Sequence, residues 1–241
     1  MTTASDPAAT TVLVTHGAWS AGWVWKKMRP RLAAHGIDLW TPTYTGVGER
    51  SHLARPDIDL DTHIADVVAV MEHEDLTDVT ILAHSYGGMV GTGVCDRVPE
   101  RVRAIIYLDA FVPSHGQSLV DLVGEAGAAD MAARAAAGDG WQVAPNPPPP
   151  DTSPEDIEWV TPRRGPQPYL TFTQPISLEA DTGHIARSYI YCQRCAPGDV
   201  FRQFSDRAAA DPQWQQREID ASHNPHITCP DELTELIRDL L

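Results

Sequence analysis

Short apolar runs rich in β-branched residues alternate along this chain with longer segments in which apolar residues recur every three or four positions. The runs predict strands at residues 11–15, 37–40, 79–84, 103–108 and 188–192, and residues 215–219 are interpreted as the last strand. The periodic segments predict helices at residues 23–34, 61–73, 86–97, 199–209 and 230–241. Repeated strand–helix alternation predicts an α/β fold, with a mainly parallel twisted sheet covered by helices on both faces.

One predicted strand runs directly into a helix through a turn of small residues. Residues 79–90 read VTILAHSYGGMV, so Ser85 has Ala83 two positions before it and Gly87 two positions after it. Bulky neighbours would clash across a sharp strand-to-helix bend, and small ones let the serine hydroxyl stand clear of the sheet. This is the nucleophile-elbow pattern G-x-S-x-G with alanine in the first small position. The pattern predicts Ser85 as a nucleophile, and the alternative is a serine in an ordinary tight turn.

Two other strand ends carry candidate groups. The sequence HGAW, residues 16–19, follows the first strand, and Asp109 follows the strand after the elbow helix. In parallel sheets, ligands bind beyond the carboxyl ends of the strands. We therefore expect both ends to lie near Ser85, with the backbone N–H of Ala18 pointing toward the serine hydroxyl.

A serine hydroxyl needs a base that removes its proton. The order nucleophile, acid, histidine predicts that this base follows the last strand, where His223 and His226 occur. We favour His223, because Pro225 and the approaching helix would turn His226 aside. At least one of the two histidines is expected to lie exposed on the surface.

The acid that orients the histidine has two candidates. The usual position is the loop after the next-to-last strand, but its first carboxylate is Asp199, seven residues beyond Cys192. Asp109 is the alternative, because a carboxylate at the end of an apolar strand is costly to bury unless it is paired. We favour Asp109 and keep Asp199 as the second candidate.

Composition narrows the class of function. The 241 residues carry a formal net charge of −15, from 18 Lys and Arg against 33 Asp and Glu. Such acidity argues against nucleic acid and anionic membranes as partners. The first residues resemble no signal peptide, and no run of about 18 apolar residues occurs. We expect a soluble, cytoplasmic protein with a small-molecule substrate, and a homodimer is left open.

The four cysteines do not indicate a metal site. Cys192 and Cys195 have C-x-x-C spacing, but no second pair with metal-ligand spacing exists, and the segment opens no thioredoxin-like unit.

The middle of the chain differs from the rest. Residues 117–138 are rich in alanine and predict helix, whereas residues 145–150 read PNPPPP and exclude helix and central strand. We interpret residues 113–186 as an inserted cap. The alternative, a disordered linker, is disfavoured by the aromatic residues of this segment, which are Trp141, Trp159, Tyr169 and Phe172. Residues 11–112 and 187–241 then form the core, after a disordered tail at residues 1–10.

From residue 12 onward, the chain resembles the α/β-hydrolase superfamily, and within it the small hydroxynitrile lyase/plant-esterase-like group. The motifs that carry the resemblance are residues 16–19, 83–88 and 108–113, together with His223 and residues 230–233. The resemblance implies an α/β-hydrolase fold with a capped apolar pocket and no cofactor. It also implies an oxyanion hole formed by the N–H groups of Ala18 and Tyr86.

One departure from that group bears on the reaction. The lyases carry a lysine after the catalytic histidine, whereas Asn224 stands there in this chain. We therefore expect a serine hydrolase, carboxylesterase-like, that cleaves esters, with lactones and thioesters as related substrates. A lyase or cyclase that uses His223 as base, and a non-catalytic small-molecule-binding homologue, are the alternatives. The expected substrate pocket includes His16, Gly17, Trp19 and His84.

Overall fold

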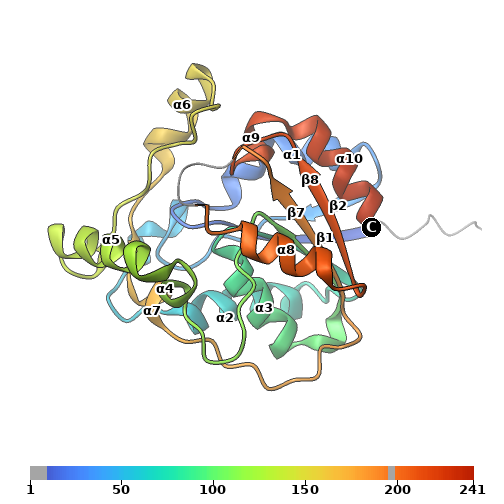
Figure 1. The fold of residues 1–241 in the computed structure, drawn as a ribbon, viewed down its shortest axis with the longest axis horizontal. Coiled ribbons are helices and arrows are strands. Elements are labelled where there is room, and N and C mark those ends of the chain that lie inside the picture. Colours follow the sequence, from blue (N-terminus) through green and yellow to red (C-terminus); the bar gives the residue numbers. More distant parts are fainter. Residues whose placement is uncertain (1–9, 195–198) are drawn as a thin grey trace, which may run out of the picture.

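Six parallel strands form the centre of the molecule in this computed structural model, which describes residues 10–194 and 199–241. The sheet order is β2-β1-β3-β4-β7-β8 (Figure 1). The strands are β1 (Thr10–Thr15), β2 (Ile37–Trp40), β3 (Val79–His84), β4 (Val102–Leu108), β7 (Ala186–Cys192) and β8 (Trp214–Ile219). The predicted parallel sheet is confirmed. Residues 1–9, which include most of the predicted tail, lie outside the described residues.

Helices cover both faces of the sheet, as the strand–helix alternation predicts. One face carries α1 (Met28–Ala33), α9 (Pro225–Thr228) and α10 (Pro230–Leu240), and the other carries α2 (Leu60–His73), α3 (Gly87–Arg97) and α8 (Arg202–Ala210). Each face has its own cluster of buried hydrophobic residues. Among the described helices, none combines the length and apolar character that crossing a bilayer requires.

The helix expected at residues 23–34 is divided in two. A 3₁₀ helix spans Gly22–Lys27, and α1 follows at Met28. Pro30 explains the break, because proline has no N–H to donate to the carbonyl of residue 26 and is tolerated only in the first turn of a helix. Trp25 and Met28 are nevertheless fully buried, so the predicted apolar face packs against the sheet.

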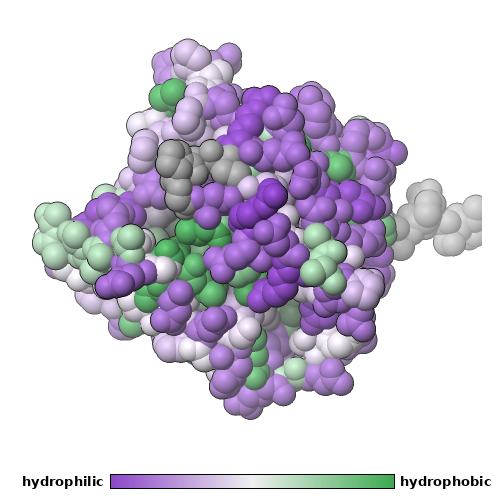
Figure 2. Space-filling model, in the orientation of Figure 1, coloured by the Kyte–Doolittle hydropathy of each residue, from purple (hydrophilic) through white to green (hydrophobic). Residues whose placement is uncertain are grey.

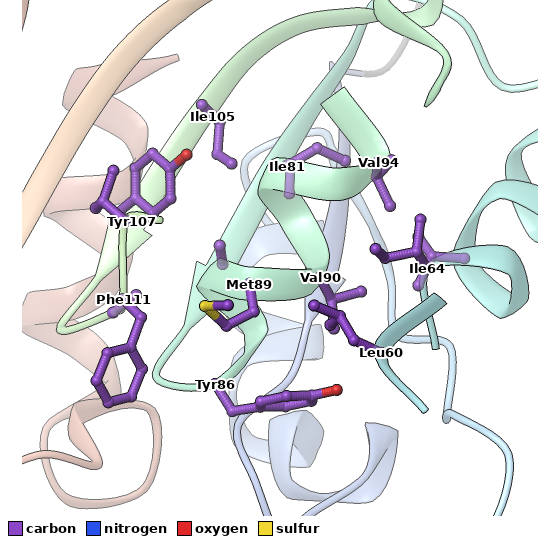
Figure 3. Packing of buried hydrophobic residues seen from close by; sticks show 14 of the residues in the cluster. Leu60, Ile64, Ile81, Tyr86, Met89, Val90, Val94, Ile105, Tyr107 and Phe111 are labelled. Carbon is purple, nitrogen blue, oxygen red and sulfur yellow. The ribbon is translucent and has the colours of Figure 1, made fainter. Parts of the chain in front are cut away.

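The strand before the elbow is buried along its whole length. All residues of β3 are buried, because helices pack on both of its sides. Ile81 and Ala83 belong to the cluster under α2 and α3, whereas Leu82 belongs to the cluster under α1 and α10. Figure 3 shows the α3 side of this packing, where Val90 lies beside Leu60 of α2.

An insertion between β4 and β7 supplies the segment interpreted as a cap. It contains α4 (Leu119–Leu122), α5 (Gly124–Ala137), α6 (Pro154–Val160) and α7 (Leu170–Thr173). A small antiparallel pair joins β5 (Gln142–Val143) to β6 (Gln167–Pro168). Helices α5 and α6 project from the body of the molecule (Figure 1). The helix predicted over the Ala-rich residues 117–138 is interrupted at Val123, which separates α4 from α5. The cap boundaries at residues 113 and 186 stay a prediction.

Helix α3 lies very close to the ends of two strands. A Cβ added to Gly87 would lie 1.8 Å from the carbonyl oxygen of Thr15, which ends β1. A Cβ added to Gly88 would lie 1.9 Å from the carbonyl oxygen of Phe111, just beyond β4. Only glycine permits this approach at either position.

Replacing Gly88 by alanine is expected to destabilise the fold by about 3 kcal/mol or more, because the clash is with backbone and cannot be relieved by a side-chain rotation. Urea unfolding of Gly88→Ala and of Gly165→Ala tests this. A Cβ at Gly165 meets nothing within 4 Å, so that variant should unfold close to wild type. Equal midpoints for the two variants would contradict the argument.

Candidate active site

Ser85 occupies a strained turn between β3 and α3. Its φ is 57°, a left-handed conformation that is unusual for residues other than glycine. Three backbone hydrogen bonds hold it there. The Ser85 N–H donates to the Leu108 carbonyl at 3.3 Å, and the Ser85 carbonyl accepts from the N–H groups of Gly88 at 3.0 Å and Phe111 at 3.2 Å. Trp19 and Asp109 also have positive φ, 57° and 42°. Strained residues therefore follow three adjacent strands, β1, β3 and β4, as is common at functional sites.

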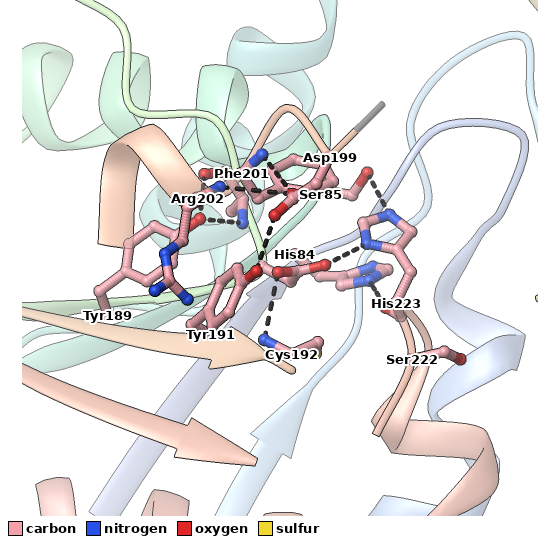
Figure 4. Close-up of polar contacts among 12 residues, drawn as sticks. His84, Ser85, Tyr189, Tyr191, Cys192, Asp199, Phe201, Arg202, Ser222 and His223 are labelled. Carbon is pink, nitrogen blue, oxygen red and sulfur yellow. Dashed lines mark hydrogen bonds and ion pairs between the residues drawn. The ribbon is translucent and has the colours of Figure 1, made fainter. Parts of the chain in front are cut away.

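Three side chains from distant parts of the chain form a continuous hydrogen-bonded series. Asp109 Oδ2 lies 2.7 Å from His223 Nδ1, and His223 Nε2 lies 2.9 Å from Ser85 Oγ. Since an ionised carboxylate only accepts, Nδ1 carries the imidazole proton, and Nε2 is left to accept a hydrogen bond from the serine hydroxyl. Figure 4 shows the ring of His223 beside Ser85. The arrangement is that of a nucleophile, a base and an orienting acid.

Asp109 is held at the end of β4. Only 4% of the residue is exposed, and the backbone N–H of Cys192 donates to its Oδ1 at 3.2 Å. Burial raises the pKa of this carboxyl, and the hydrogen bond from His223 opposes that shift by favouring the charged form. Asp109 is therefore a buried acid whose charge is stabilised chiefly by the imidazole.

Asp199, the other candidate acid, bonds elsewhere. Its Oδ2 accepts from the hydroxyl of Tyr191 at 2.7 Å, and its Oδ1 accepts from the backbone N–H of Phe201 at 2.8 Å and from that of Arg202. These bonds resemble those of a helix cap, which explains why α8 begins at Arg202 and not at residue 199. Of the two candidates, Asp109 is the one hydrogen-bonded to His223.

His223 has further contacts that the sequence did not reveal. The ring of Phe201 stacks on the imidazole, with centroids 4.9 Å apart and planes 12° apart. His84 Nε2 lies 2.8 Å from the carbonyl oxygen of His223, so His84 is a donor at Nε2.

The residue before His223 is also held in place. Asp151, from the segment between β5 and α6, accepts from both the N–H (3.0 Å) and the hydroxyl of Ser222. In the sequence, Asp151 is marked only by its position directly after the proline run, and that position indicates no hydrogen-bond partner.

His226, the competing base, lies inside the protein. Only 1% of it is exposed, and it stacks on Trp25 with ring centroids 4.6 Å apart. The expectation that His223 or His226 would lie exposed is therefore wrong, because Trp25 covers His226 and Phe201 covers one face of the His223 ring. Burial lowers the pKa of His226 to about 3, helped by the nearby His223.

His16 is not where the sequence suggested. It was expected in the pocket, but it is fully buried and is not among the cavity-lining residues. Its ring stacks on Tyr44 at 3.8 Å, and its Nδ1 lies 2.9 Å from the carbonyl oxygen of Gly17. Burial lowers its pKa to about 3. Packing beneath the HGAW turn, and not contact with a substrate, accounts for this residue.

The two N–H groups expected in an oxyanion hole are free within the described part of the chain. Neither the N–H of Ala18 nor that of Tyr86 donates a hydrogen bond there, and both residues line the cavity beside Ser85. The next N–H, on Trp19, is used, because it donates to Gln167 Oε1 at 3.0 Å. The oxyanion-hole assignment is compatible with this geometry and stays a prediction.

A cavity of about 850 Å³ opens onto Ser85 and His223. Gly17, Trp19 and His84 also line it. Most other lining side chains are apolar, among them Phe111, Leu119, Val123, Met131, Phe172, Phe201 and Ile227. Apolar side chains also gather on the surface between α5 and α8 (Figure 2). The site therefore pairs a small polar series with a large apolar chamber, as ligand pockets commonly do.

Comparison with known proteins agrees with this arrangement. The model of the alpha/beta hydrolase family matches residues 12–236. A carbendazim hydrolyzing esterase from Nocardioides sp. is 37% identical over 238 residues, covering 95% of this chain and 98% of that protein. A pyrethroid hydrolase from Sphingobium wenxiniae is 30% identical over 110 residues, covering 44% of this chain and 38% of that protein.

Solved structures confirm the predicted α/β-hydrolase fold. An extracellular alpha/beta-hydrolase from a Paenibacillus species superposes with a TM-score of 0.84 at 21% identity, covering 95% of this chain and 98% of that one. Tomato methylketone synthase I gives 0.80 at 14% identity and covers 98% of both chains. At such identities the likeness concerns the fold alone.

Removing the Asp151 carboxylate is expected to lower kcat about tenfold or more, because the loop that carries His223 loses two hydrogen bonds and small displacements of a reacting group are costly. Ser222→Ala removes only the hydroxyl bond and keeps the backbone N–H bond, so it should lower kcat less than Asp151→Ala does, and KM should change less than kcat in both variants. Glu155, an exposed carboxylate four residues further on in the first turn of α6, supplies the matched control, and Glu155→Ala should keep its turnover. Wild-type kcat in Asp151→Ala would contradict this role.

The buried histidines should make the fold sensitive to acid. Between pH 6.5 and about 3, the unfolded chain binds a proton at His226 that the folded protein excludes, so stability falls as the pH falls through this window. At pH 5 the loss is about 2 kcal/mol for this one residue. His226→Phe keeps a ring against Trp25 and should lose about that much less stability than wild type between pH 7 and pH 5. Denaturant unfolding at both pH values measures it, and parallel losses in the two proteins would refute it.

Proposed function

The chain belongs to the alpha/beta hydrolase family, and we propose that it is a serine esterase that cleaves carboxylic esters through an acyl-Ser85 intermediate. The observation that carries the proposal is the hydrogen-bonded series from Asp109 through His223 to Ser85, at the wall of an apolar cavity. The esterase that is 37% identical over almost the whole chain supports the same reaction class.

The geometry supports a two-stage acyl transfer. Ser85 Oγ attacks the ester carbonyl while His223 Nε2 takes its proton, and Asp109 stabilises the imidazolium that forms. The imidazolium then protonates the departing alcohol as the carbon–oxygen bond breaks. Water then attacks the acyl carbonyl while His223 takes one of its protons. The imidazolium returns that proton to Ser85 Oγ as the bond between the acyl carbon and Oγ breaks, which releases the acid and restores the serine.

The developing negative charge needs donors that are already in place. The N–H groups of Ala18 and Tyr86 serve this role in the proposal, since both line the cavity beside Ser85 and neither is bonded within the described residues. A donor of this kind contributes about 3 kcal/mol to transition-state stabilisation. The strained turns at Trp19 and Ser85 are the structural cost of presenting these groups.

The cavity supports a small, largely apolar substrate. Its volume of about 850 Å³ suits a molecule of drug size, and its lining is mostly aliphatic and aromatic. The lyase alternative is not favoured, because Asn224 follows His223 and no lysine is among the lining residues of the described chain. Lys27 is bound instead to Asp156, at 2.6 Å.

A cytoplasmic location is part of the proposal. Cys95 and Cys229 are free thiols, which suits a reducing compartment, whereas Cys195 lies outside the described residues. The net charge of −15 supports a small molecule over nucleic acid as partner.

The nucleophile and acid can be tested together. A fluorophosphonate probe should label wild-type protein but not Ser85→Ala, and Ser85→Ala should lose essentially all hydrolysis of 4-nitrophenyl esters. Asp109→Asn should lower kcat by about 10⁴, because the imidazole loses the partner that fixes its tautomer. Asp199→Asn is the matched carboxylate control, with an expected loss below tenfold. A labelled Ser85→Ala protein, or equal losses in the two Asp variants, would overturn the assignment.

A further inference from the structure

Most charged side chains that line the cavity are paired with an opposite charge. Asp109 is bound to His223, and Arg134 Nε lies 2.9 Å from Asp130 Oδ2. Arg194, at the exposed margin, forms a two-pronged pair with Asp220 at 2.8 and 2.9 Å. Each of these pairs satisfies its charges within the protein.

Arg164 differs from the others. It lines the same cavity from the cap segment, directly after the short 3₁₀ helix Thr161–Arg163. No carboxylate of the described chain lies within ion-pair distance of it. Its one hydrogen bond there runs from Nη1 to the carbonyl oxygen of Asn146, at 2.5 Å. Its guanidinium is therefore a cation without a counter-charge on a wall that is otherwise mostly apolar.

The unused donors of Arg164 remain accessible. A guanidinium has five N–H donors in a planar fork, and the Asn146 carbonyl occupies one of them. None of the side-chain nitrogens of Arg164 is among the buried polar atoms that lack a partner, so those without a bond are not sealed inside the protein. The residue is half-buried, and burial alone lowers its pKa, since no neighbouring carboxylate compensates. A charge in this position is stabilised best by an anion that enters the cavity.

The surroundings of Arg164 hold it in place. Arg134 donates to the side-chain Oδ1 of Asn146 at 2.7 Å, and Arg164 donates to the backbone carbonyl of the same residue, so both arginines are hydrogen-bonded to Asn146. Arg134 also lies over the ring of Trp19, at 5.3 Å from its centroid. The indole N–H of Trp19 in turn donates to the Val143 carbonyl at 2.9 Å. Through Asn146 and Arg134, Arg164 is therefore connected to Trp19, which follows Ala18 in the turn after β1.

We propose that Arg164 is the substrate-specificity residue of this cavity and that it binds a carboxylate carried by the ester substrate at a distance from the scissile bond. The substrate class is then a half-ester of a dicarboxylic acid, with an apolar linker lying against the aliphatic and aromatic walls. This inference rests on the proposed esterase function and adds to it a charge requirement that an apolar pocket alone would not impose.

Matched chromogenic esters test the charge requirement. Mono-4-nitrophenyl esters of adipic, suberic and sebacic acid end in a carboxylate, and their terminal carboxamides are neutral partners of the same length. At pH 7.5 and low salt, wild-type kcat/KM should favour the carboxylate over its carboxamide by about 10- to 100-fold at the best-fitting length. Arg164→Gln should reduce that ratio to about one, mainly through KM, and Arg164→Lys should retain part of it.

Arg194→Gln is the matched control, because it also removes a cavity-margin arginine but one already paired with Asp220. It should keep the wild-type ratio, whereas an equal fall in both variants would show only a general loss of positive potential and would overturn the proposal. A wild-type ratio near one at all three lengths also overturns it, whether or not Arg164→Gln folds. Hydrolysis of neither series, with no fluorophosphonate labelling of Ser85, would instead overturn the esterase function.

Discussion

The close approach of helix α3 to the ends of β1 and β4 is the constraint on which the site depends. Gly87 and Gly88 allow the helix backbone to lie where any Cβ would collide with the carbonyl oxygens of Thr15 and Phe111. That approach forces the sharp bend at Ser85, which accepts a φ of 57° so that its hydroxyl leaves the sheet. The same bend places Tyr86 at the cavity, so one packing constraint positions both Ser85 and the N–H group that is proposed as an oxyanion donor.

The sheet order then decides what Ser85 faces. The chain runs from β1 outward to β2 and returns to β3 on the other side of β1, so β1 and β3 flank a switch point where parallel sheets bind ligands. The turn after β1 carries Ala18, and the turn after β3 carries Ser85. The site therefore needs no long-range adjustment to bring a backbone donor to the nucleophile. The position of His223, by contrast, depends on residues from four other segments, which are Asp109, His84, Phe201 and Asp151.

The sequence predicted the local features well because they follow from local rules. Short apolar runs located β1, β2, β3, β4 and β7 of the main sheet, and small residues around Ser85 indicated the elbow. The sequence favoured Asp109 over Asp199 but left both open, because the position of the acid depends on β4 pairing with β7, which brings the Cys192 N–H to Asp109. The burial of His226 against Trp25 and the bond from Ser222 to Asp151 are likewise contacts between distant segments. No pattern within a window of sequence encodes them.

The imidazoles around His223 explain how one proton acceptor is singled out in a histidine-rich site. The His84 ring lies 4.8 Å from that of His223, and the His226 ring lies 4.7 Å from that of His84. Burial, with the neighbouring imidazoles adding to it, lowers the pKa of His84 well below its usual range, and burial does the same for His226. Two neutral rings of this kind neither repel the imidazolium that forms at His223 nor compete with it for the serine proton. His223 alone combines a bond to a carboxylate with a free nitrogen facing Ser85, so the charge of catalysis is confined to the one ring that Asp109 can stabilise.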